Sequence, residues 1–393
     1  MALPVNPRPS ELRLVVFTDT FFEVNGIGTY YRTLLDWCRK THAAKMTVLC
    51  PAREDLPARD IPEGVIPVRP SIHLGNPLYK DMPIGAFSGR KLLSIVESLD
   101  GRKLIHIATS GSLGRKGARV AKKLRLPSVG FFHTDFHLIG PVYGKSLLGA
   151  PGGWLARRIA CRFDKLAYGA CSAVFAPSPS ACRTVRRFYS GEPVLLPCPL
   201  NVERFRPAPT RAGVFRTRYA RNGSVLAAVV GRAAKEKNLD LVCELLACDP
   251  RISLVFVGDG PYRPALEKRW GARYTGFLHG PQLLEAYQQA DVYVQLSLTE
   301  TFGMALGEAI ASGLPAVVLK SPGFVETIPP GYGVEVLEPH DLAGLADRCV
   351  AMVRDPVQHQ EHARRAREWA LRCAPDQVLP RFIECHQAVA QSS

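Results

Sequence analysis

Residues 12–18 read LRLVVFT, and the polar pair Asp19–Thr20 follows at once. An uninterrupted apolar run of this length predicts a strand buried on both faces, as in a parallel sheet. A helical pattern follows at about residues 28–40, and the alternation of the two patterns then continues. Further strand-like runs fall at 46–50, 104–108, 128–132 and 173–176, and helical stretches at 88–99, 113–126, 154–170 and 180–189. This order predicts an α/β fold with helices on both faces of a parallel sheet.

The stretch from Leu196 to Arg211 carries four prolines and no apolar period, so it is typical of a linker. After it, strands are expected at 224–230, 252–257, 292–296 and 316–319, and helices at 238–247, 261–270, 281–290 and 304–312. Because one core rarely exceeds about 250–300 residues, a chain of 393 residues predicts two domains. We expect an N-terminal domain at 1–200, a second domain at 201–372, and a helix at 373–393 that crosses back to the first domain.

The net charge of +15 is concentrated in one segment. Residues 101–220 hold 21 Lys and Arg against four acidic residues, whereas the rest of the chain holds 29 basic and 31 acidic residues. Such a field favours an anionic partner, namely a phosphate substrate, an acidic membrane or nucleic acid. A solvated basic surface remains the alternative. Nucleic acid is disfavoured because no recognisable DNA- or RNA-binding motif is present.

The cysteines indicate a reducing compartment. There are 11, scattered along the chain without a CxxC pair, which disfavours both a disulfide framework and a zinc site. The N-terminus shows no charged region followed by an apolar one, and no run of about 18 apolar residues occurs. We therefore expect a cytoplasmic protein without a membrane span, whose contact with a membrane would be peripheral, on its inner face.

Two carboxylates separated by seven residues form the strongest candidate site. Glu300 is expected in the loop after a strand, and Glu308 about one turn into the next helix. Residues Thr301–Gly303 would supply backbone N–H groups at the start of that helix, where anions and hydroxyl-rich ligands bind well. The alternative is a helix capping box, because Ser297 and Glu300 have its spacing.

Two cations follow the strand at 224–230. Arg232 and Lys237, with Lys235 between them, are expected at the beginning of a helix, where the helix dipole disfavours positive charge. A bound diphosphate would reverse that preference. An exposed basic helix start is the alternative.

Two further motifs lie in the N-terminal half. His133-Thr134-Asp135 follows a strand, and a histidine that faced a cleft there would titrate near neutral pH. Gly26 and Gly28 form a GxG loop after the first strand, but Tyr31 stands where a dinucleotide-binding motif has its third glycine. The loop is therefore weak evidence for a nicotinamide-dependent oxidoreductase, and it suits close approach of a ligand to the backbone.

Together these motifs resemble the retaining glycosyltransferases of family 4, which includes bacterial phosphatidylinositol mannosyltransferases, glycolipid α-mannosyltransferases, sucrose synthases and sulfoquinovosyl-diacylglycerol synthases. The resemblance rests on the Glu300 and Arg232 motifs, on VGDGP at 257–261 and SGLPAVV at 312–318, and on FTDTF at 17–21, VNGIGT at 24–29, IHIATSGSLG at 105–114 and FHTDF at 132–136. It implies the GT-B fold, in which two Rossmann-like domains face each other across a cleft. It also implies a hexosyltransferase that uses a nucleotide diphosphate sugar and needs no metal.

The resemblance also implies a role for each matching residue. Arg232 and Lys237 would hold the donor diphosphate, Glu300 would lie beside the donor sugar, and His133 near its primary hydroxyl. The expected donor-binding set is Gly26, Gly28, Thr275, Phe277, Phe302, Gly303, Met304 and Glu308, the last on the ribose. Asp19 and Asp135 would lie on the acceptor side. GDP-mannose and UDP-glucose remain alternative donors, and the acceptor would be a glycolipid or another membrane-associated glycan.

Two departures from the family pattern stand out. Pro199–Val202 replaces the usual Gly-Val-Asp before the hinge, and Gly323 alone remains of a Gly-Gly pair, with an altered loop expected at 324–336. A non-catalytic sugar-nucleotide-binding protein would share the donor motifs and is the main alternative function. For the membrane, the helix at 113–126 is the candidate, because Leu113, Val120 and Leu124 can share a face beside basic residues.

Overall fold

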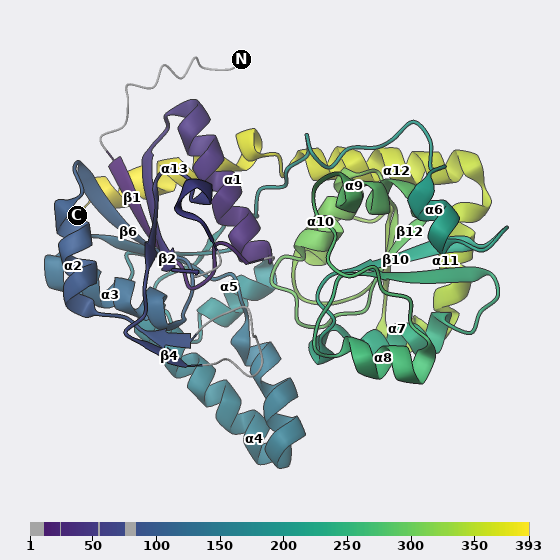
Figure 1. Ribbon diagram of the computed structural model, residues 1–393, viewed down its shortest axis with the longest axis horizontal. Helices are drawn as coiled ribbons and strands as arrows, with labels where there is room; N and C mark the ends of the chain where they lie inside the picture. The colour runs from purple at the N-terminus through teal and green to yellow at the C-terminus, as the bar shows by residue number, and fades with distance from the viewer. Residues whose placement is uncertain (1–11, 24, 54–55, 75–83, 393) are drawn as a thin grey trace. The chain divides into compact units, whose positions relative to one another are not determined.

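The computed structural model describes residues 12–23, 25–53, 56–74 and 84–392 and divides the chain into two compact units (Figure 1). Unit 1 comprises Met1–Pro177, Ala181–Pro199 and Pro375–Ser393. Unit 2 comprises Ser178–Ser180 and Leu200–Ala374. The end of the chain therefore belongs to the unit in which the chain begins.

A seven-stranded parallel sheet forms the centre of unit 1, in the order β3-β2-β1-β6-β7-β8-β9. Its strands are β1 (Leu12–Phe17), β2 (Lys45–Pro51), β3 (Val65–Val68), β6 (Arg102–Ile107), β7 (Ser128–Phe131), β8 (Ala173–Ala176) and β9 (Val194–Leu195). An antiparallel pair, β4 (Ile72–Leu74) and β5 (Ile84–Ala86), lies outside this sheet. The helices are α1 (Gly26–Thr41), α2 (Gly89–Ser98), α3 (Ser112–Leu124), α4 (Phe136–Tyr168), α5 (Pro179–Val185) and α13 (Pro375–Gln391).

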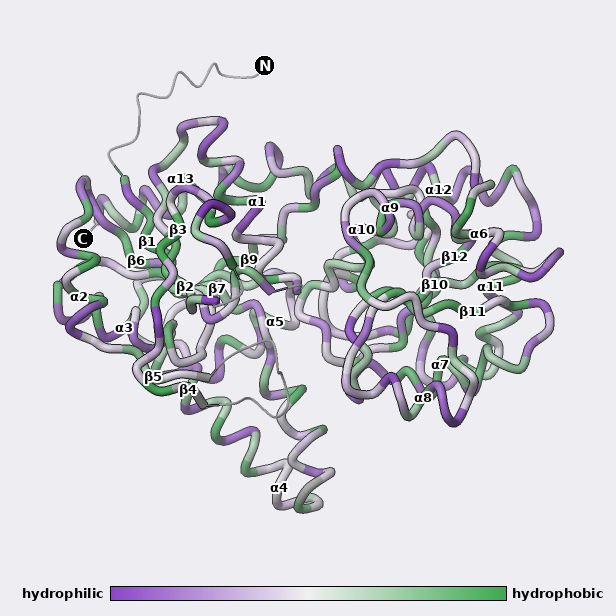
Figure 2. The backbone as a smooth tube through the Cα atoms, viewed as in Figure 1, coloured by the Kyte–Doolittle hydropathy of each residue, from purple (hydrophilic) through white to green (hydrophobic). Residues whose placement is uncertain are grey.

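Strand β1 shows why the apolar run at its start is continuous. Successive side chains of a strand point to opposite faces, so both faces of β1 must be apolar if both are covered. Val15 and Phe17 belong to the core that also contains residues of α2, α3 and α5. Helices α1 and α13 contact each other, and α13 also contacts β6 and β7. Figure 2 shows the apolar strands at the centre of the unit.

The apolar face of α3 lies in this core, which corrects the membrane assignment of that helix. Leu113 and Val120 are 0% and 3% exposed, and Leu124 packs against the same cluster. A Cβ at Gly117 would come within 2.6 Å of the Phe17 ring, so the helix lies directly against β1. A face that already packs on the sheet is not available to a lipid surface.

Helix α4 is a hairpin of two helical arms. Its dihedral angles depart from helical values at Leu148 and Gly149, where the chain turns back. The arms approach closely at glycines, because a Cβ at Gly152 would lie 2.3 Å from the carbonyl oxygen of Gly144. The stretch at 140–153, which the sequence suggests is an acceptor loop, instead forms most of the first arm and the turn (Figure 1).

Unit 2 contains a five-stranded parallel sheet in the order β11-β10-β12-β13-β14. Its strands are β10 (Val225–Val230), β11 (Ile252–Val257), β12 (Val292–Gln295), β13 (Ala316–Leu319) and β14 (Val334–Leu337). Its helices are α6 (Val214–Tyr219), α7 (Leu239–Leu246), α8 (Arg263–Trp270), α9 (Gly280–Gln289), α10 (Met304–Ala311), α11 (Leu345–Arg354) and α12 (Pro356–Leu371). Strand β14 was not predicted and includes the end of the stretch expected as an altered loop.

Short 3-10 turns lie at Ala58–Asp60, Lys235–Lys237, Phe324–Thr327 and Pro339–Gly344. In the part of the chain that the structure describes, every helix is too short or too polar to cross a bilayer.

Candidate active site

Glycines shape the loops that follow β10 and β11. Gly231 and Gly258 have φ angles of 143° and 142°, a region that side-chain-bearing residues rarely adopt. A Cβ at Gly258 would lie 2.0 Å from the carbonyl oxygen of Gly231, and one at Gly260 would lie 2.4 Å from that of Ala233. The two loops therefore pack backbone against backbone at the carboxyl ends of their strands, where open α/β sheets bind ligands.

The two predicted diphosphate-binding cations lie on the β10 loop. Arg232 pairs with Glu236, whose side chain is buried. Lys237 ends the 3-10 turn Lys235–Lys237, and its Nζ donates to Glu300 Oε1 at 2.5 Å. The structure thus brings together Lys237 and Glu300, which the sequence separates by 63 positions.

Glu300 lies in the loop between β12 and α10, and not in a helix. Helix α10 begins at Met304, with Gly303 as its N-cap in the left-handed region at φ 94°. The Ser297 hydroxyl contacts the Thr299 hydroxyl at 3.4 Å. The capping-box interpretation of Ser297 and Glu300 is therefore wrong, because no helix begins between them. The buried Phe302 ring holds this loop against the unit.

Glu308 lies one turn into α10, on the same side of the helix as Met304. Its carboxylate accepts a hydrogen bond from the Tyr287 hydroxyl at 2.9 Å. Burial raises the pKa of Glu308 to about 7, and the hydrogen bond from Tyr287 opposes that rise. The group therefore changes charge near neutral pH.

The predicted base-binding segment joins the end of β11. Thr275 N donates to Phe256 O at 3.0 Å, and Gly258 N donates to Gly276 O at 2.9 Å. Phe277 follows and is 43% exposed. The segment therefore lies beside the glycine loop at Gly258.

Sequence reasoning missed a set of contacts around Glu300. A Cβ at Gly323 would lie 3.1 Å from the Cβ of Glu300, and Gly323 N donates to the Ser180 hydroxyl at 3.1 Å. Ser178 donates to Thr301 O at 2.7 Å. In the sequence, Gly323 stands out only as a departure from the Gly-Gly pair of the family. Ser178–Ser180 carried no signal, since these residues come from the N-terminal half of the sequence.

In unit 1, the predicted acceptor-side carboxylates cap helices. Asp19 accepts from the hydroxyl of Thr109 at 2.6 Å and from the backbone N–H groups of Leu113 and Gly114 at 2.7 and 3.2 Å, which are the first turn of α3. Asp135 accepts from the N–H of His137 at 2.9 Å at the start of α4. Both carboxylates therefore stabilise the start of a helix. Their contact with an acceptor stays a prediction.

His133 is buried, and burial lowers its pKa to about 3. The expectation that it titrates near neutral pH is therefore wrong, because the positive imidazolium is disfavoured away from water. Its Nε2 lies 3.0 Å from the Tyr31 hydroxyl. Gly26 and Gly28 lie in the first turn of α1, where the Asn25 side chain accepts from Gly28 N at 2.8 Å.

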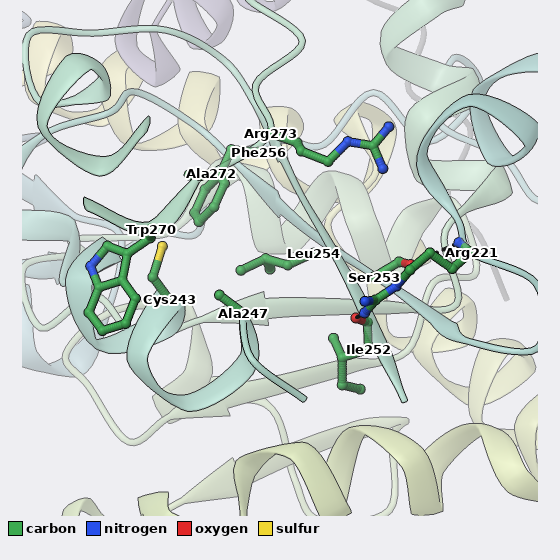
Figure 3. A pocket seen from close by; sticks show the side chains of 11 residues that line it. Arg221, Cys243, Ala247, Ile252, Ser253, Leu254, Phe256, Trp270, Ala272 and Arg273 are labelled. Atoms are coloured by element: carbon green, nitrogen blue, oxygen red, sulfur yellow. Dashed lines mark hydrogen bonds between the residues drawn. The ribbon is translucent and has the colours of Figure 1, made fainter. Parts of the chain in front are cut away.

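A cavity of about 160 Å³ lies elsewhere in unit 2, along the outer strand β11 (Figure 3). Cys243 and Trp270 line one end, and Arg221 and Ser253 the other. None of the predicted site residues lines it. It is a gap between β11, α7 and the end of α8, and we assign it no part in the site.

Two family models match the chain. The model described as Glycosyltransferase Family 4 matches residues 24–204, and the one described as Glycosyl transferases group 1 matches residues 215–369. Together they cover most of both units.

Named relatives agree with these matches. A GDP-mannose-dependent alpha-mannosyltransferase of Mycobacterium tuberculosis is 26% identical over 94% of this chain and 96% of its own length. The sulfoquinovosyl transferase SQD2 of Arabidopsis thaliana is 26% identical over 92% of this chain and 70% of its own length.

Solved structures show the same fold. Anabaena HepE in complex with UDP and glucose has a TM-score of 0.75 at 17% identity and covers 96% of this chain and 99% of that one. A sucrose-phosphate synthase from Thermosynechococcus elongatus also has a TM-score of 0.75 at 17% identity, with 97% and 100% covered. The fold is GT-B, with two Rossmann-like α/β domains, and the chain is a hexosyltransferase that belongs to glycosyltransferase family 4.

Proposed function

We propose that the protein transfers a hexose from a nucleotide diphosphate sugar to an acceptor hydroxyl, with retention of the α configuration and without a metal ion. The observation that carries this proposal is the pairing of Lys237 with Glu300 at 2.5 Å, on loops at the carboxyl ends of two strands. In this proposal the cation of the pair binds the diphosphate and the neighbouring carboxylate binds the sugar.

In this mechanism the bond between the anomeric carbon and the diphosphate oxygen breaks. The acceptor oxygen forms its bond to the same face of the anomeric carbon, and its proton passes to the departing diphosphate. Lys237 and Arg232 stabilise the negative charge that develops on that diphosphate. The nucleotide diphosphate leaves carrying both electrons of the broken bond, so no oxidant or further reactant is needed.

The other residues bind and orient the donor. Glu300 orients sugar hydroxyls and forms no covalent bond, while the N–H groups at Phe302–Met304 bind sugar and phosphate oxygens at the start of α10. Glu308 accepts from the ribose hydroxyls, and Thr275 with Phe277 contacts the base. Holding donor and acceptor in one geometry is the main source of rate enhancement in this scheme.

The donor is a GDP- or UDP-hexose. A named relative uses GDP-mannose, and HepE was solved with UDP and glucose. A thermal-shift screen against GDP, UDP, ADP and their hexose derivatives identifies the donor, because a ligand that binds only the folded state raises the apparent melting temperature. Proton NMR of the product then assigns the anomer. A β-linked product would overturn the proposed retention, and hydrolysis without transfer would overturn the proposed reaction.

For the acceptor we propose a glycolipid at an anionic membrane surface. Relatives include alpha-monoglucosyldiacylglycerol synthase of Acholeplasma laidlawii, 30% identical over 55% of this chain and 58% of its own length. A cytoplasmic enzyme that used such an acceptor would need to reach the inner face of the membrane.

The surface that suits this contact lies on the second arm of α4. Leu155, Ile159 and Leu166 are 47%, 44% and 50% exposed, and their spacing places them on one face of the helix. Trp154 and Phe163 extend the patch. Four exposed basic residues lie on the same arm, namely Arg157, Arg158, Arg162 and Lys165.

An apolar stripe with a basic border fits an anionic bilayer surface. Each basic residue near anionic lipid contributes about 1 kcal/mol, so four contribute on the order of 4 kcal/mol. Charge and hydropathy together thus support the proposal of an anionic membrane as the partner.

Flotation with vesicles tests this surface. The wild type should float with vesicles that contain anionic lipid, and the Leu155→Gln/Ile159→Gln double variant should float much less. Val357→Gln, at a 76% exposed position of α12, is the matched control and should behave as the wild type. Equal flotation of the double variant and the wild type would reject α4 as the docking surface.

A further inference from the structure

A chain of hydrogen bonds runs through the buried interior of unit 1 and ends at His133. It passes through Tyr31 on α1, His106 on β6 and His386 on α13. All three side chains are fully buried. The rings also pack on each other, since the centroids of His106 and His386 lie 5.1 Å apart in a stacked arrangement.

Four contacts make up this chain. His386 Nδ1 lies 2.6 Å from Phe382 O, and His386 Nε2 lies 2.9 Å from His106 Nδ1. His106 Nε2 lies 2.7 Å from the Tyr31 hydroxyl, which lies 3.0 Å from His133 Nε2. Both ring nitrogens of His386 and of His106, and Nε2 of His133, thus have a partner at hydrogen-bond distance.

The histidines in this chain are neutral. Burial lowers the pKa of His386 to about 4 and that of His133 to about 3. The pKa of His106 is lowered by burial and by its neighbours His386 and His133, which both disfavour a positive charge. A neutral imidazole carries one proton, so one nitrogen donates and the other accepts.

The carbonyl at the far end sets the direction of the whole chain. Phe382 O can only accept, so His386 carries its proton on Nδ1 and accepts at Nε2. His106 must then donate from Nδ1 and accept at Nε2. His106 Nε2 therefore accepts a hydrogen bond from the Tyr31 hydroxyl, which uses the only proton of that hydroxyl.

The Tyr31 oxygen has no second proton to give, so it accepts from His133. We propose that the Phe382 carbonyl, acting through His386, His106 and Tyr31, holds His133 in the tautomer with its proton on Nε2 and an unprotonated Nδ1. Tyr31, His106 and His386 are then positioning residues. Phe382 on helix α13 thereby sets the tautomer of His133, which lies 249 positions earlier in the chain.

The catalytic consequence rests on the proposed function, in which His133 lies near a sugar hydroxyl. With its proton directed at Tyr31, His133 has no proton at Nδ1 to donate and can only accept there. The same bond to Tyr31 fixes the plane of the ring. In any contact between His133 Nδ1 and a donor sugar, the sugar hydroxyl would therefore be the donor.

Long-range proton–nitrogen NMR on the full chain with ¹⁵N-labelled histidine tests the tautomer directly. The His133 signals are identified by their loss in His133→Gln. In the wild type, Nε2 should have the shift of a protonated nitrogen and Nδ1 that of an unprotonated one. A proton on Nδ1, or a charged ring at pH 7, would overturn the proposal.

Variants test the transmission along the chain. His386→Phe keeps a ring of similar size but removes the acceptor for His106, whereas the amide oxygen of His386→Gln can still accept. We expect His386→Phe and Tyr31→Phe to shift the His133 nitrogen signals towards a mixture of tautomers. We expect kcat/KM for the donor to fall about tenfold in both, and His386→Gln to restore most of it.

Circular dichroism and melting temperature show whether each variant folds. If His386→Phe does not fold, Tyr31→Phe tests the last link on its own. Folded variants with wild-type His133 signals and wild-type kcat/KM would reject the transmission. If the wild type transferred no hexose from any donor, the proposed function would fail, and the NMR spectrum would still decide the tautomer.

Discussion

At the scale of single residues, the site depends on charges held close to one another. Lys237 and Glu300 lie 2.5 Å apart, and Arg232 pairs with the buried Glu236. A carboxylate within this distance of a cation holds the cation in place, as the proposed binding of a diphosphate requires. Catalysis by such groups is strong because they need no reorganisation when charge develops.

Lys237→Ala should lower kcat by about 100-fold or more, because it removes a cation from the departing diphosphate. Steady-state kinetics with the identified donor measure this effect. Lys320→Ala is the matched control, since Lys320 also forms an ion pair at 2.5 Å, with Glu338, but at an exposed position in the same unit. A kcat near that of the wild type in Lys237→Ala would remove Lys237 from the mechanism.

The raised pKa of Glu308 leads us to expect that nucleotide binding depends on pH. Its pKa is raised to about 7 by burial, and a ribose that donates to it requires the carboxylate. As the pH falls below about 7, more of the free protein carries a proton on Glu308, so affinity should fall by about tenfold per pH unit well below the pKa. Calorimetry between pH 5 and 8 measures this slope.

Glu308→Gln is the control for that titration. It should bind the nucleotide with an affinity that changes little over this range, because the amide has no proton to lose. An equally steep pH dependence in the variant would assign the titration to another group.

At the scale of elements, short contacts between backbones decide shapes that the residue pattern leaves open. The α4 hairpin is held where Gly152 meets the Gly144 carbonyl, and the glycine loops after β10 and β11 are held in the same way. Within α4, His137 in the first arm also contacts Asp164 in the second at 3.0 Å. The exposed apolar stripe thus lies on α4, whose two arms are held together by these contacts.

Gly152→Ala should destabilise the protein by about 1–3 kcal/mol, because its Cβ would lie 2.3 Å from a backbone oxygen and the arms must separate. Urea unfolding measures the change. Gly89→Ala is the control, because no atom lies within 4 Å of its added Cβ, and it should be neutral or stabilising by about 0.4–1 kcal/mol. Equal stability of the two variants would contradict the packing of the hairpin.

At the scale of the whole molecule, the excess of positive charge belongs to one part of the chain. Of the 21 basic residues at 101–220, 16 precede Pro199 and fall within unit 1, which also carries the apolar stripe of α4. The proposed donor-binding cations Arg232 and Lys237 lie in unit 2. The proposed donor cations therefore do not account for this excess of charge, and the proposed anionic membrane surface would.

Membrane binding should therefore depend on salt. Raising the ionic strength from 0.1 to 1 M shortens the screening length from about 10 to about 3 Å, so the fraction of protein bound to anionic vesicles should fall steeply. Cosedimentation at the two salt concentrations measures it, with vesicles of zwitterionic lipid as the control. Binding that did not change with salt would assign the contact to the apolar stripe alone.

Strong local patterns made most of the fold predictable. Buried parallel strands are continuous apolar runs, so β1, β10 and β11 were placed within a residue or two. β3 and β14 were missed because the two central positions of each are not buried, whereas the equally short β12 and β13 are buried throughout. The apolar face of α3 was real, but a helical period cannot distinguish a core from a membrane as the partner of that face.

The sequence alone determined the alternation of strands and helices, the family resemblance and the pairs Glu300–Glu308 and Arg232–Lys237, because each is written in neighbouring residues. Only the tertiary structure decided which groups meet. Lys237 contacts Glu300, and Asp19 and Asp135 accept hydrogen bonds from backbone N–H groups at helix starts. His133 is connected to α13 through a chain of hydrogen bonds. Those contacts join residues brought together by packing, and their energies depend on burial, which no local pattern specifies.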